Sequence, residues 1–294
     1  HLRLNQGAFV KFIFPLLILT LTSGFAREIE IMSYNVENLF DTVHDEGKDD
    51  WSYLPKDAPG KAEACLKEDA PYIKSCQESD WTEAKLALKL ENIAHVVKGS
   101  RGNKLPDILA LSEVENLNVA KMLAAKLGFN KVHATEGKDG RGIDVVLMFN
   151  ETDDLKFREV KVHEVKGHEY FKTKPTRPIL EVRFKVDGKY NLHVFVNHWP
   201  SQANPSEVRM KAADTLTDIV KRRMLLKKKT NFVIALGDFN VLPTDYPHAF
   251  HEEVYKELKD LHVTFMEDKA TTSEQKKMMP MGSYFYAPTM SWDL

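Results

Sequence analysis

The chain has 294 residues, of which 43% are apolar and 29% are charged. This length allows one large domain or two small ones, and the composition excludes long disorder, collagen and coiled coils. Lysine and arginine number 41 against 43 acidic residues, so the formal net charge is −2. Such a chain has no global positive field to attract nucleic acid. Any polyanionic substrate must therefore be bound locally, by a metal ion or a few placed cations.

The first 26 residues are predicted to be a secretory signal peptide. Arg3 and Lys11 precede an apolar run at residues 12–21, and small residues stand at the minus-three and minus-one positions of a cut after Ala26. This order of charge, apolar run and small residues is typical of exported proteins. The run is too short to span a bilayer, which takes about 20 residues. We therefore expect a secreted or periplasmic mature chain at residues 27–294, without a transmembrane segment.

Residues 41–80 are predicted to be a long insert between two core elements. The segment is rich in charged residues, proline and glycine and has no sustained apolar period. It contains both cysteines of the chain, Cys65 and Cys76. In an oxidising compartment the pair is expected to form a disulfide. The loss of loop entropy in the unfolded chain would then stabilise the folded state by about 3 kcal/mol. The alternative is two free surface thiols.

Hydrophobic periodicity predicts mixed helices and strands along the chain. Strands are expected at residues 28–36, 107–111, 143–149 and 232–236, and helices at 81–97, 117–127, 205–226 and 245–261. A β-hairpin is expected at 179–196, because Asp187 and Gly188 form a tight-turn dipeptide between two alternating runs. Hairpins mixed with helices favour an α+β fold, a mixed two-sheet sandwich covered by helices, over a parallel doubly wound sheet.

Polar residues recur at the ends of these strands. Each has an ordinary structural alternative, as a turn former, a helix N-terminal charge or a rim histidine. Their recurrence in order predicts that they meet at one rim of the sheets. These residues are Asn35, Glu113, Asp144, His198, Asp238 and Asn240.

Five short motifs around these residues resemble the ordered motifs of the endonuclease/exonuclease/phosphatase superfamily. They read SYNVEN at 33–38, LSEVEN at 111–116, GIDVV at 142–146, NHWPS at 197–201 and GDFN at 237–240. GDFN alone is moderately specific, whereas all five in order are highly specific. The resemblance covers residues 28–294. It implies a four-layered α/β sandwich, with two mixed β-sheets packed face to face and helices outside.

The resemblance also implies a divalent metal centre. Glu113 would be the principal ligand, with Asn35 close by. Oxygen ligands suit a hard cation such as Mg²⁺, and Mn²⁺ or Ca²⁺ could take its place.

The same resemblance assigns roles around the reacting phosphate. Asp238 would orient or deprotonate the attacking water, and Asn240 would hold a phosphate oxygen. His198 would contact the phosphate and support the acid/base step, for which a histidine is suited. Asp144 is placed in the same catalytic group.

Two arginines are candidates for phosphate binding, because a planar guanidinium matches phosphate geometry. Arg141 is assigned to substrate binding. For Arg177, a solvated surface arginine is at least as strong an alternative.

The sequence departs from the family pattern after Asn240. Family members carry an Asp-His pair near their final strand, and no such pair is found here; His248, His251 and His262 lack the context, and Asp293 is not placed like the family's aspartate. A C-terminally incomplete sequence is expected, and a non-catalytic member is the alternative.

Three functions follow from these observations. The first is a secreted, metal-dependent phosphodiesterase that acts on nucleic acid, as a monomer without a stable protein partner. The second keeps the chemistry but acts on a phospholipid or another small phosphoester. The third is a binding protein on a catalytically inactive fold.

Overall fold

The computed structural model describes residues 28–99, 102–165, 167, 169–226, 230–242, 244–258, 284–286 and 291–293. The predicted signal peptide, His262 and the side chain of Asp293 lie outside this part of the chain. Within it, no helix is long and apolar enough to cross a membrane.

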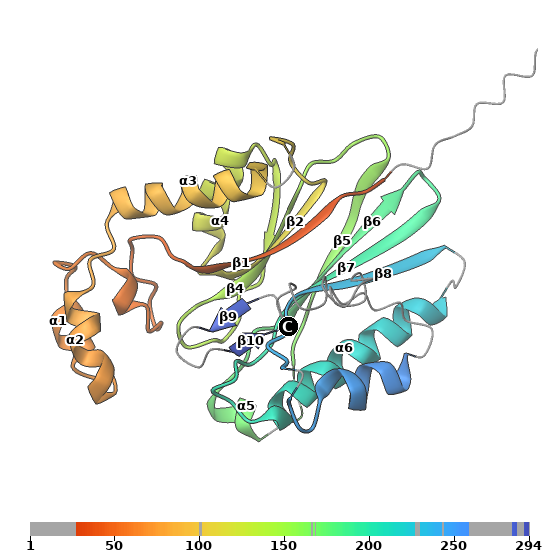
Figure 1. Cartoon of the computed structure of the whole chain (residues 1–294). Helices are drawn as coiled ribbons and strands as arrows, with labels where there is room; N and C mark the ends of the chain where they lie inside the picture. The colour runs from red at the N-terminus through yellow and green to blue at the C-terminus, as the bar shows by residue number, and fades with distance from the viewer. Residues whose placement is uncertain are drawn as a thin grey trace, which may run out of the picture.

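Two four-stranded mixed sheets form the centre of the molecule (Figure 1). The first has the order β1-β2-β4-β3, in which β1 and β2 are parallel and the other pairs antiparallel. Its strands are β1 (Ile31–Leu39), β2 (Ile108–Val114), β3 (Lys131–Ala134) and β4 (Asp144–Phe149). The second has the order β5-β6-β7-β8, in which only β7 and β8 are parallel. Its strands are β5 (Leu155–His163), β6 (Ile179–Val186), β7 (Tyr190–His198) and β8 (Asn231–Asp238). A separate antiparallel pair is formed by β9 (Tyr284–Tyr286) and β10 (Ser291–Asp293).

The two sheets pack face to face through an apolar layer. Fully buried side chains of β2 and β4, such as Ala110 and Leu147, form one cluster with those of β6 and β7, such as Val182 and Val194. Removal of this much apolar surface from water is the main force that holds the sheets together.

Helices cover both outer faces of the sandwich (Figure 1). α3 (Glu83–Gly99) and α4 (Leu117–Leu127) pack on the first sheet, with Leu90 and Leu123 against Leu109 and Met148. On the second sheet, α6 (Ser206–Leu226) and η2 (Phe250–Tyr255) form the outer layer. The predicted four-layered α/β sandwich is therefore confirmed.

Local signals in the sequence account for several element boundaries. Asn116 caps α4 by accepting a hydrogen bond from the Val119 amide, and Gly128 ends the helix with a left-handed φ of 94°. Asp187 and Gly188 have φ values of 48° and 61°, as the predicted tight turn between β6 and β7 requires.

Some of the secondary structure differs from the prediction, including the unpredicted short helix α5 (Tyr170–Thr173). β3 and β5 are not among the predicted elements, because β3 has four residues and β5 changes its alternation at a bulge between Phe157 and Glu159. The helix predicted at 245–261 begins only at Phe250. Asp245 instead accepts hydrogen bonds from Arg209 and the Leu242 amide. Residues 259–261 lie outside the described part of the chain.

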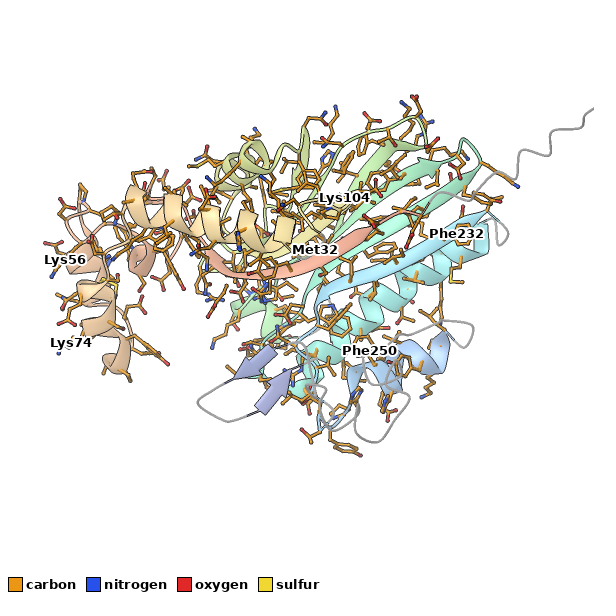
Figure 2. The ribbon with its side chains drawn as sticks, turned by 45° about the horizontal axis from the view of Figure 1, so that its top comes forward. Met32, Lys56, Lys74, Lys104, Phe232 and Phe250 are labelled. Atoms are coloured by element: carbon orange, nitrogen blue, oxygen red, sulfur yellow. A yellow bond between two sulfur atoms is a disulfide. The ribbon has the colours of Figure 1, made fainter. Side chains whose placement is uncertain are left out.

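The insert at 41–80 is more ordered than predicted. It contains η1 (Trp51–Tyr53), α1 (Lys61–Cys65) and α2 (Ala70–Glu78), and the Cys65–Cys76 disulfide joins the two helices, as the sequence predicts. Neither helix has an apolar face long enough to be recognised by periodicity. Lys56 and Lys74 of the insert lie at the opposite end of the molecule from Phe232 of β8 (Figure 2).

Candidate active site

Four of the predicted side chains meet at one rim, three from the ends of β2, β7 and β8 and Asn35 from the middle of β1. The Asn35 amide donates to the carboxylates of Glu113, at 3.1 Å, and Asp238, at 2.8 Å. The His198 Nε2 lies 3.8 Å from Glu113 and 3.9 Å from Asp238. The parallel pairs β1–β2 and β7–β8 explain this meeting, because parallel strands bring their carboxyl ends to the same edge.

Irregular backbone aims these side chains. Glu113 has a φ of 63° at a register shift between Ser112 and Val114, so a bulge in β2 turns its side chain toward the site. Asn240 has a φ of 50° just after β8. Left-handed backbone is costly for residues other than glycine and tends to gather at functional sites.

Gly237 permits the close approach of β7 and β8 at the site. Its φ is 121°, and a Cβ atom there would lie 2.0 Å from the Asn197 carbonyl oxygen. Asn197 and His198 pair in register with Gly237 and Asp238. The glycine of the GDFN motif therefore allows His198 and Asp238 to lie side by side.

The donor atoms fit a divalent cation. Glu113, His198 and Asp238 each offer one ligand atom, and these atoms lie within 4.8 Å of one another. Two carboxylates provide the oxygen donors that hard cations prefer. Asn35, predicted as a second ligand, has its amide nitrogen toward the carboxylates, while its oxygen accepts from the Glu37 amide at 2.8 Å. In this arrangement Asn35 positions the carboxylates by hydrogen bonds.

Burial dominates the electrostatics of the centre. It lowers the pKa of His198 well below the usual value, and the charges of Arg177 and Arg141 lower it further. Burial also raises the pKa of Asp238, against hydrogen bonds from Asn35 and the Asn240 amide that lower it. The His198 Nδ1 atom is buried and has no hydrogen-bond partner among the described residues.

Arg177 is 9% exposed, so the alternative of an exposed surface arginine is wrong. Its guanidinium pairs with Asp139 at 3.1 Å and donates to the Trp199 carbonyl oxygen at 2.9 Å. The side-chain amide of Asn240 donates to the same carbonyl oxygen at 3.1 Å. The backbone amide of Asn240 donates to the Asp238 carboxylate at 3.0 Å. Arg177 thus brings a buried positive charge close to His198.

Asp144 supports the loop beside the centre. Its carboxylate, 4% exposed, accepts hydrogen bonds from the Thr135 hydroxyl at 2.6 Å and the Gly137 amide at 2.9 Å. Burial raises its pKa, and these hydrogen bonds lower it. The loop that it holds carries Arg141, whose side chain reaches Asn38 at 3.5 Å. The contacts of Asp144 indicate a positioning role in place of the predicted catalytic one.

One side chain near the centre is not among the predicted site residues. Burial raises the pKa of Tyr53 in the insert, the positive charge of Arg141 lowers it, and the negative charge of Glu113 raises it. No motif or period marks Tyr53, because its position depends on how the insert folds back onto the sandwich.

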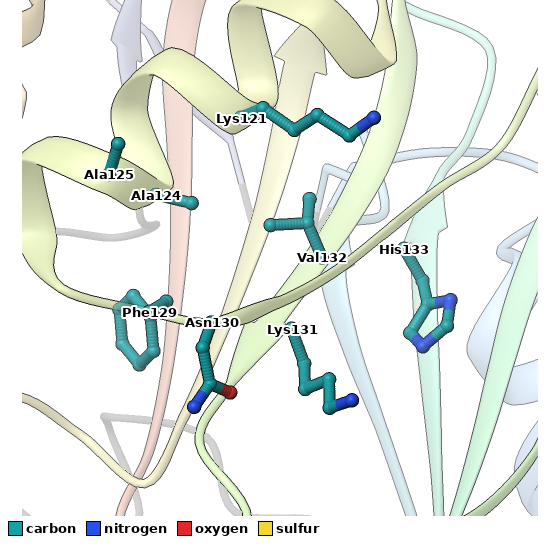
Figure 3. A pocket seen from close by; sticks show the side chains of 8 residues that line it. All are labelled: Lys121, Ala124, Ala125, Phe129, Asn130, Lys131, Val132 and His133. Atoms are coloured by element: carbon teal, nitrogen blue, oxygen red, sulfur yellow. The ribbon is translucent and has the colours of Figure 1, made fainter.

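A hollow elsewhere on the surface does not belong to this centre. It measures about 400 Å³ and lies between α4 and β3, lined by residues such as Lys121, Phe129 and His133 (Figure 3). None of the four residues that meet at the strand ends lines it.

The chain belongs to the endonuclease/exonuclease/phosphatase family, whose model matches residues 30–286. Members of this family are metal-dependent phosphoesterases. No curated protein matches the sequence.

Several solved structures are similar to the chain. The human Nocturnin catalytic domain with a bound sulfate anion is 14% identical, with a TM-score of 0.49, and the match covers 84% of this chain and 76% of that one. The 2′,3′-cyclic phosphatase ANGEL2, in complex with adenosine-2′,3′-vanadate, is 15% identical, with a TM-score of 0.49 and coverage of 76% and 57%. Truncated TDP2 from Caenorhabditis elegans is 18% identical, with a TM-score of 0.43; the match covers 55% of this chain and 58% of TDP2.

Proposed function

We propose that the protein is an exported, divalent-metal-dependent phosphodiesterase that hydrolyses phosphodiester bonds of nucleic acids. One observation supports the chemistry above all others. Glu113, His198 and Asp238 meet within 4.8 Å, and the buried Arg177 acts on the same histidine. The carboxylates of Glu113 and Asp238 can ligate a metal ion, and the guanidinium of Arg177 lies buried near them. This arrangement suits a phosphate bound between a metal ion and an arginine.

Each residue of the centre has a part in this proposal. A divalent cation held by Glu113 and Asp238 would supply the positive charge that stabilises the phosphoryl oxygens in the transition state. His198, kept neutral by burial, can accept a proton at Nε2, the atom that faces both carboxylates. Asn35 and the Asn240 amide hold Asp238 in place.

The choice of nucleic acid and of an exported location has separate support. The motif pattern and the apolar run at 12–21 lead to both expectations. The Cys65–Cys76 disulfide suits an oxidising compartment, since disulfides rarely persist in reducing cytosol. Export is tested by expression of the chain with its own leader and mass spectrometry of the secreted product. An N-terminus at residue 27 is expected, and an intact leader on cell-associated protein would contradict export.

The activity is tested with bis(p-nitrophenyl) phosphate in the presence of Mg²⁺. We expect hydrolysis that EDTA abolishes and added Mg²⁺ or Mn²⁺ restores. Plasmid DNA, RNA and sphingomyelin are then compared as substrates under the same conditions. Cleavage of sphingomyelin alone would replace nucleic acid by a lipid substrate. Folded protein without metal-dependent turnover on any of them would indicate a non-catalytic member of the fold.

A further inference from the structure

The hollow between α4 and β3 has two chemically different sides. Its volume of about 400 Å³ lies within the range of small-ligand sites in proteins. Phe129 and Ala125 lie on one side (Figure 3). The ammonium ends of Lys121 and Lys131 lie on the other, which is also the side of His133 (Figure 3). A ligand that matches both sides has an apolar body and an anionic group.

The cationic side carries charge that no carboxylate of the described residues neutralises. Neither Lys121 nor Lys131 has an ion pair in the part of the chain that the structure describes, whereas Lys126 of the same helix pairs with Glu91 at 2.5 Å. The described residues that line the hollow include no acid. Two ammonium groups attract a group with two negative charges, and a phosphate monoester carries about −1.5 to −2 at neutral pH.

The backbone around the hollow is held in place before any ligand binds. The amides of Gly128 and Phe129 both donate to the Ala124 carbonyl oxygen, at 2.8 and 2.9 Å. The Asn150 side chain accepts from the Asn130 amide at 2.8 Å and donates to the Gly128 carbonyl oxygen at 3.0 Å. A ligand that binds here therefore avoids the cost of ordering a flexible loop.

The apolar side suits a planar base. Phe129 is 6% exposed and packs into the core between α4 and the first sheet, so its ring is a fixed part of the wall. The backbone amide of Asn130 is bound to Asn150, but its side chain has no hydrogen-bond partner among the described residues. A side-chain amide offers both a donor and an acceptor, which can pair with the edge of a nucleobase. An acyl chain would offer this amide no partner.

We propose that this hollow is a nucleotide-binding site. Lys121 and Lys131 bind the phosphate, and Asn130 pairs with the edge of the base beside the ring of Phe129. The inference goes beyond the proposed function, because binding here needs neither the metal centre nor turnover. A free nucleotide and a nucleotide within a nucleic-acid strand share this chemistry. Since none of the four residues that meet at the strand ends lines the hollow, the bound nucleotide is not the one that is hydrolysed.

Calorimetry of the full chain with adenosine monophosphate tests the site, with EDTA present to keep metal ions from the candidate active site. Lys121→Ala and Lys131→Ala should each raise Kd about 10-fold or more, the size of one lost hydrogen bond to a charged group. Ala125→Leu should also weaken binding, because it fills the hollow and keeps both charges. Lys126→Ala is the matched control with the wild-type Kd, since Lys126 is bound to Glu91 and does not line the hollow. A Kd that none of these substitutions changes, with melting temperatures retained, would overturn the site.

Smaller probes test whether the ligand needs both of its parts. Inorganic phosphate and adenosine should each bind about 10-fold or more weakly than adenosine monophosphate, because each matches one side only. Phosphate that binds as tightly as the nucleotide would overturn the role of the base. Adenosine that binds as tightly would overturn the role of the lysines. Wild-type protein that does not bind the nucleotide would overturn the whole proposal.

A DNA strand of about eight nucleotides distinguishes the two sources of the nucleotide. Lys131-dependent binding that is tighter than that of adenosine monophosphate would assign the site to a strand. Lys131-dependent but weaker binding would assign it to a free nucleotide, and both results support the site.

Photolabelling with 8-azidoadenosine monophosphate locates the bound nucleotide. Trypsin cleavage after Lys126 and Lys131 releases residues 127–131, which contain Phe129 and Asn130. We expect the label on this peptide. Label confined to the peptides that carry Glu113, His198 or Asp238 would place the nucleotide at the candidate active site and overturn the assignment.

Discussion

Glu115 offers a quantitative test of the structure, because its carboxyl is buried close to other acids. It is 3% exposed and accepts a hydrogen bond from the Asp41 amide at 2.8 Å. Burial raises the pKa of Glu115 to about 8, and the charges of Asp41, Asp45 and Asp50 add to the rise against the lowering effect of that hydrogen bond. At neutral pH the side chain is therefore mostly protonated.

This shift makes stability depend on pH with a definite sign. The ordinary glutamate pKa is 4.5, so between pH 4.5 and about 8 the folded state binds more protons at Glu115 than the unfolded state does. The contribution of Glu115 to stability is full below pH 4.5 and is lost as the pH rises through about 8. Each pKa unit corresponds to about 1.4 kcal/mol, so the loss approaches about 5 kcal/mol at its upper limit.

Glu115→Gln isolates this effect, because glutamine has the same size, stays neutral and can still accept from the Asp41 amide. Urea unfolding of both proteins at pH 5, 7 and 9 gives the difference in free energy of unfolding. We expect the free energy of unfolding of the variant, relative to that of the wild type, to increase by several kcal/mol between pH 5 and 9. Glu78→Gln, at an exposed position of α2, serves as the control. A difference between wild type and Glu115→Gln that stays constant with pH would refute a protonated, buried Glu115.

Three further predictions concern the other carboxylates. Glu113→Gln should abolish Mg²⁺-dependent hydrolysis with the fold retained by circular dichroism, because a charged ligand is lost at nearly constant volume; Glu78→Gln should keep full activity. Asp238→Asn should lower kcat by about 100-fold or more with a modest change in KM, since a ligand that holds the cation at the phosphoryl oxygens acts mainly in the transition state, and a change in KM alone would mean that Asp238 only binds substrate. Burial opposes ionisation of Glu181, but hydrogen bonds from two histidines and Arg223 prevail and lower its pKa. Its contribution to stability should therefore fade as the pH falls below about 4.5, and Glu181→Gln, which leaves Arg223 without its buried partner, should lose about 3 kcal/mol in urea unfolding at pH 7.

The meeting of Asn35, Glu113, His198 and Asp238 could be predicted because order along the chain and strand topology agree. Glu113, His198 and Asp238 end or nearly end their strands, and Asn35 pairs in register with Ser112, next to Glu113, so the two parallel pairs bring all four to one rim. The apolar patterns that mark the strands are local, so they can be recognised in the sequence without knowledge of the tertiary fold.

The roles of Arg177 and Asp144 could not be predicted in the same way. Both side chains are buried, and burial depends on what packs over a residue. Arg177 is covered because Asp139 and the Trp199 carbonyl oxygen bind its guanidinium, and these partners come from two other segments. Asp144 is turned to its own loop by Thr135 and Gly137, so a residue expected to act on substrate supports the backbone instead.

The structure of the insert at residues 41–80 could not be predicted from hydrophobic periodicity. Its short helices have no apolar period because a disulfide and the buried Lys61 replace the apolar face that normally fixes a helix. Residues 41–80 lack hydrophobic periodicity, which predicts a loosely ordered surface segment. The segment is nevertheless ordered by the disulfide and by Lys61. Because Asp49 and Lys48 of the insert bind the loop that carries Arg141, an insertion into this fold can help to set the position of that loop while every motif residue stays in place.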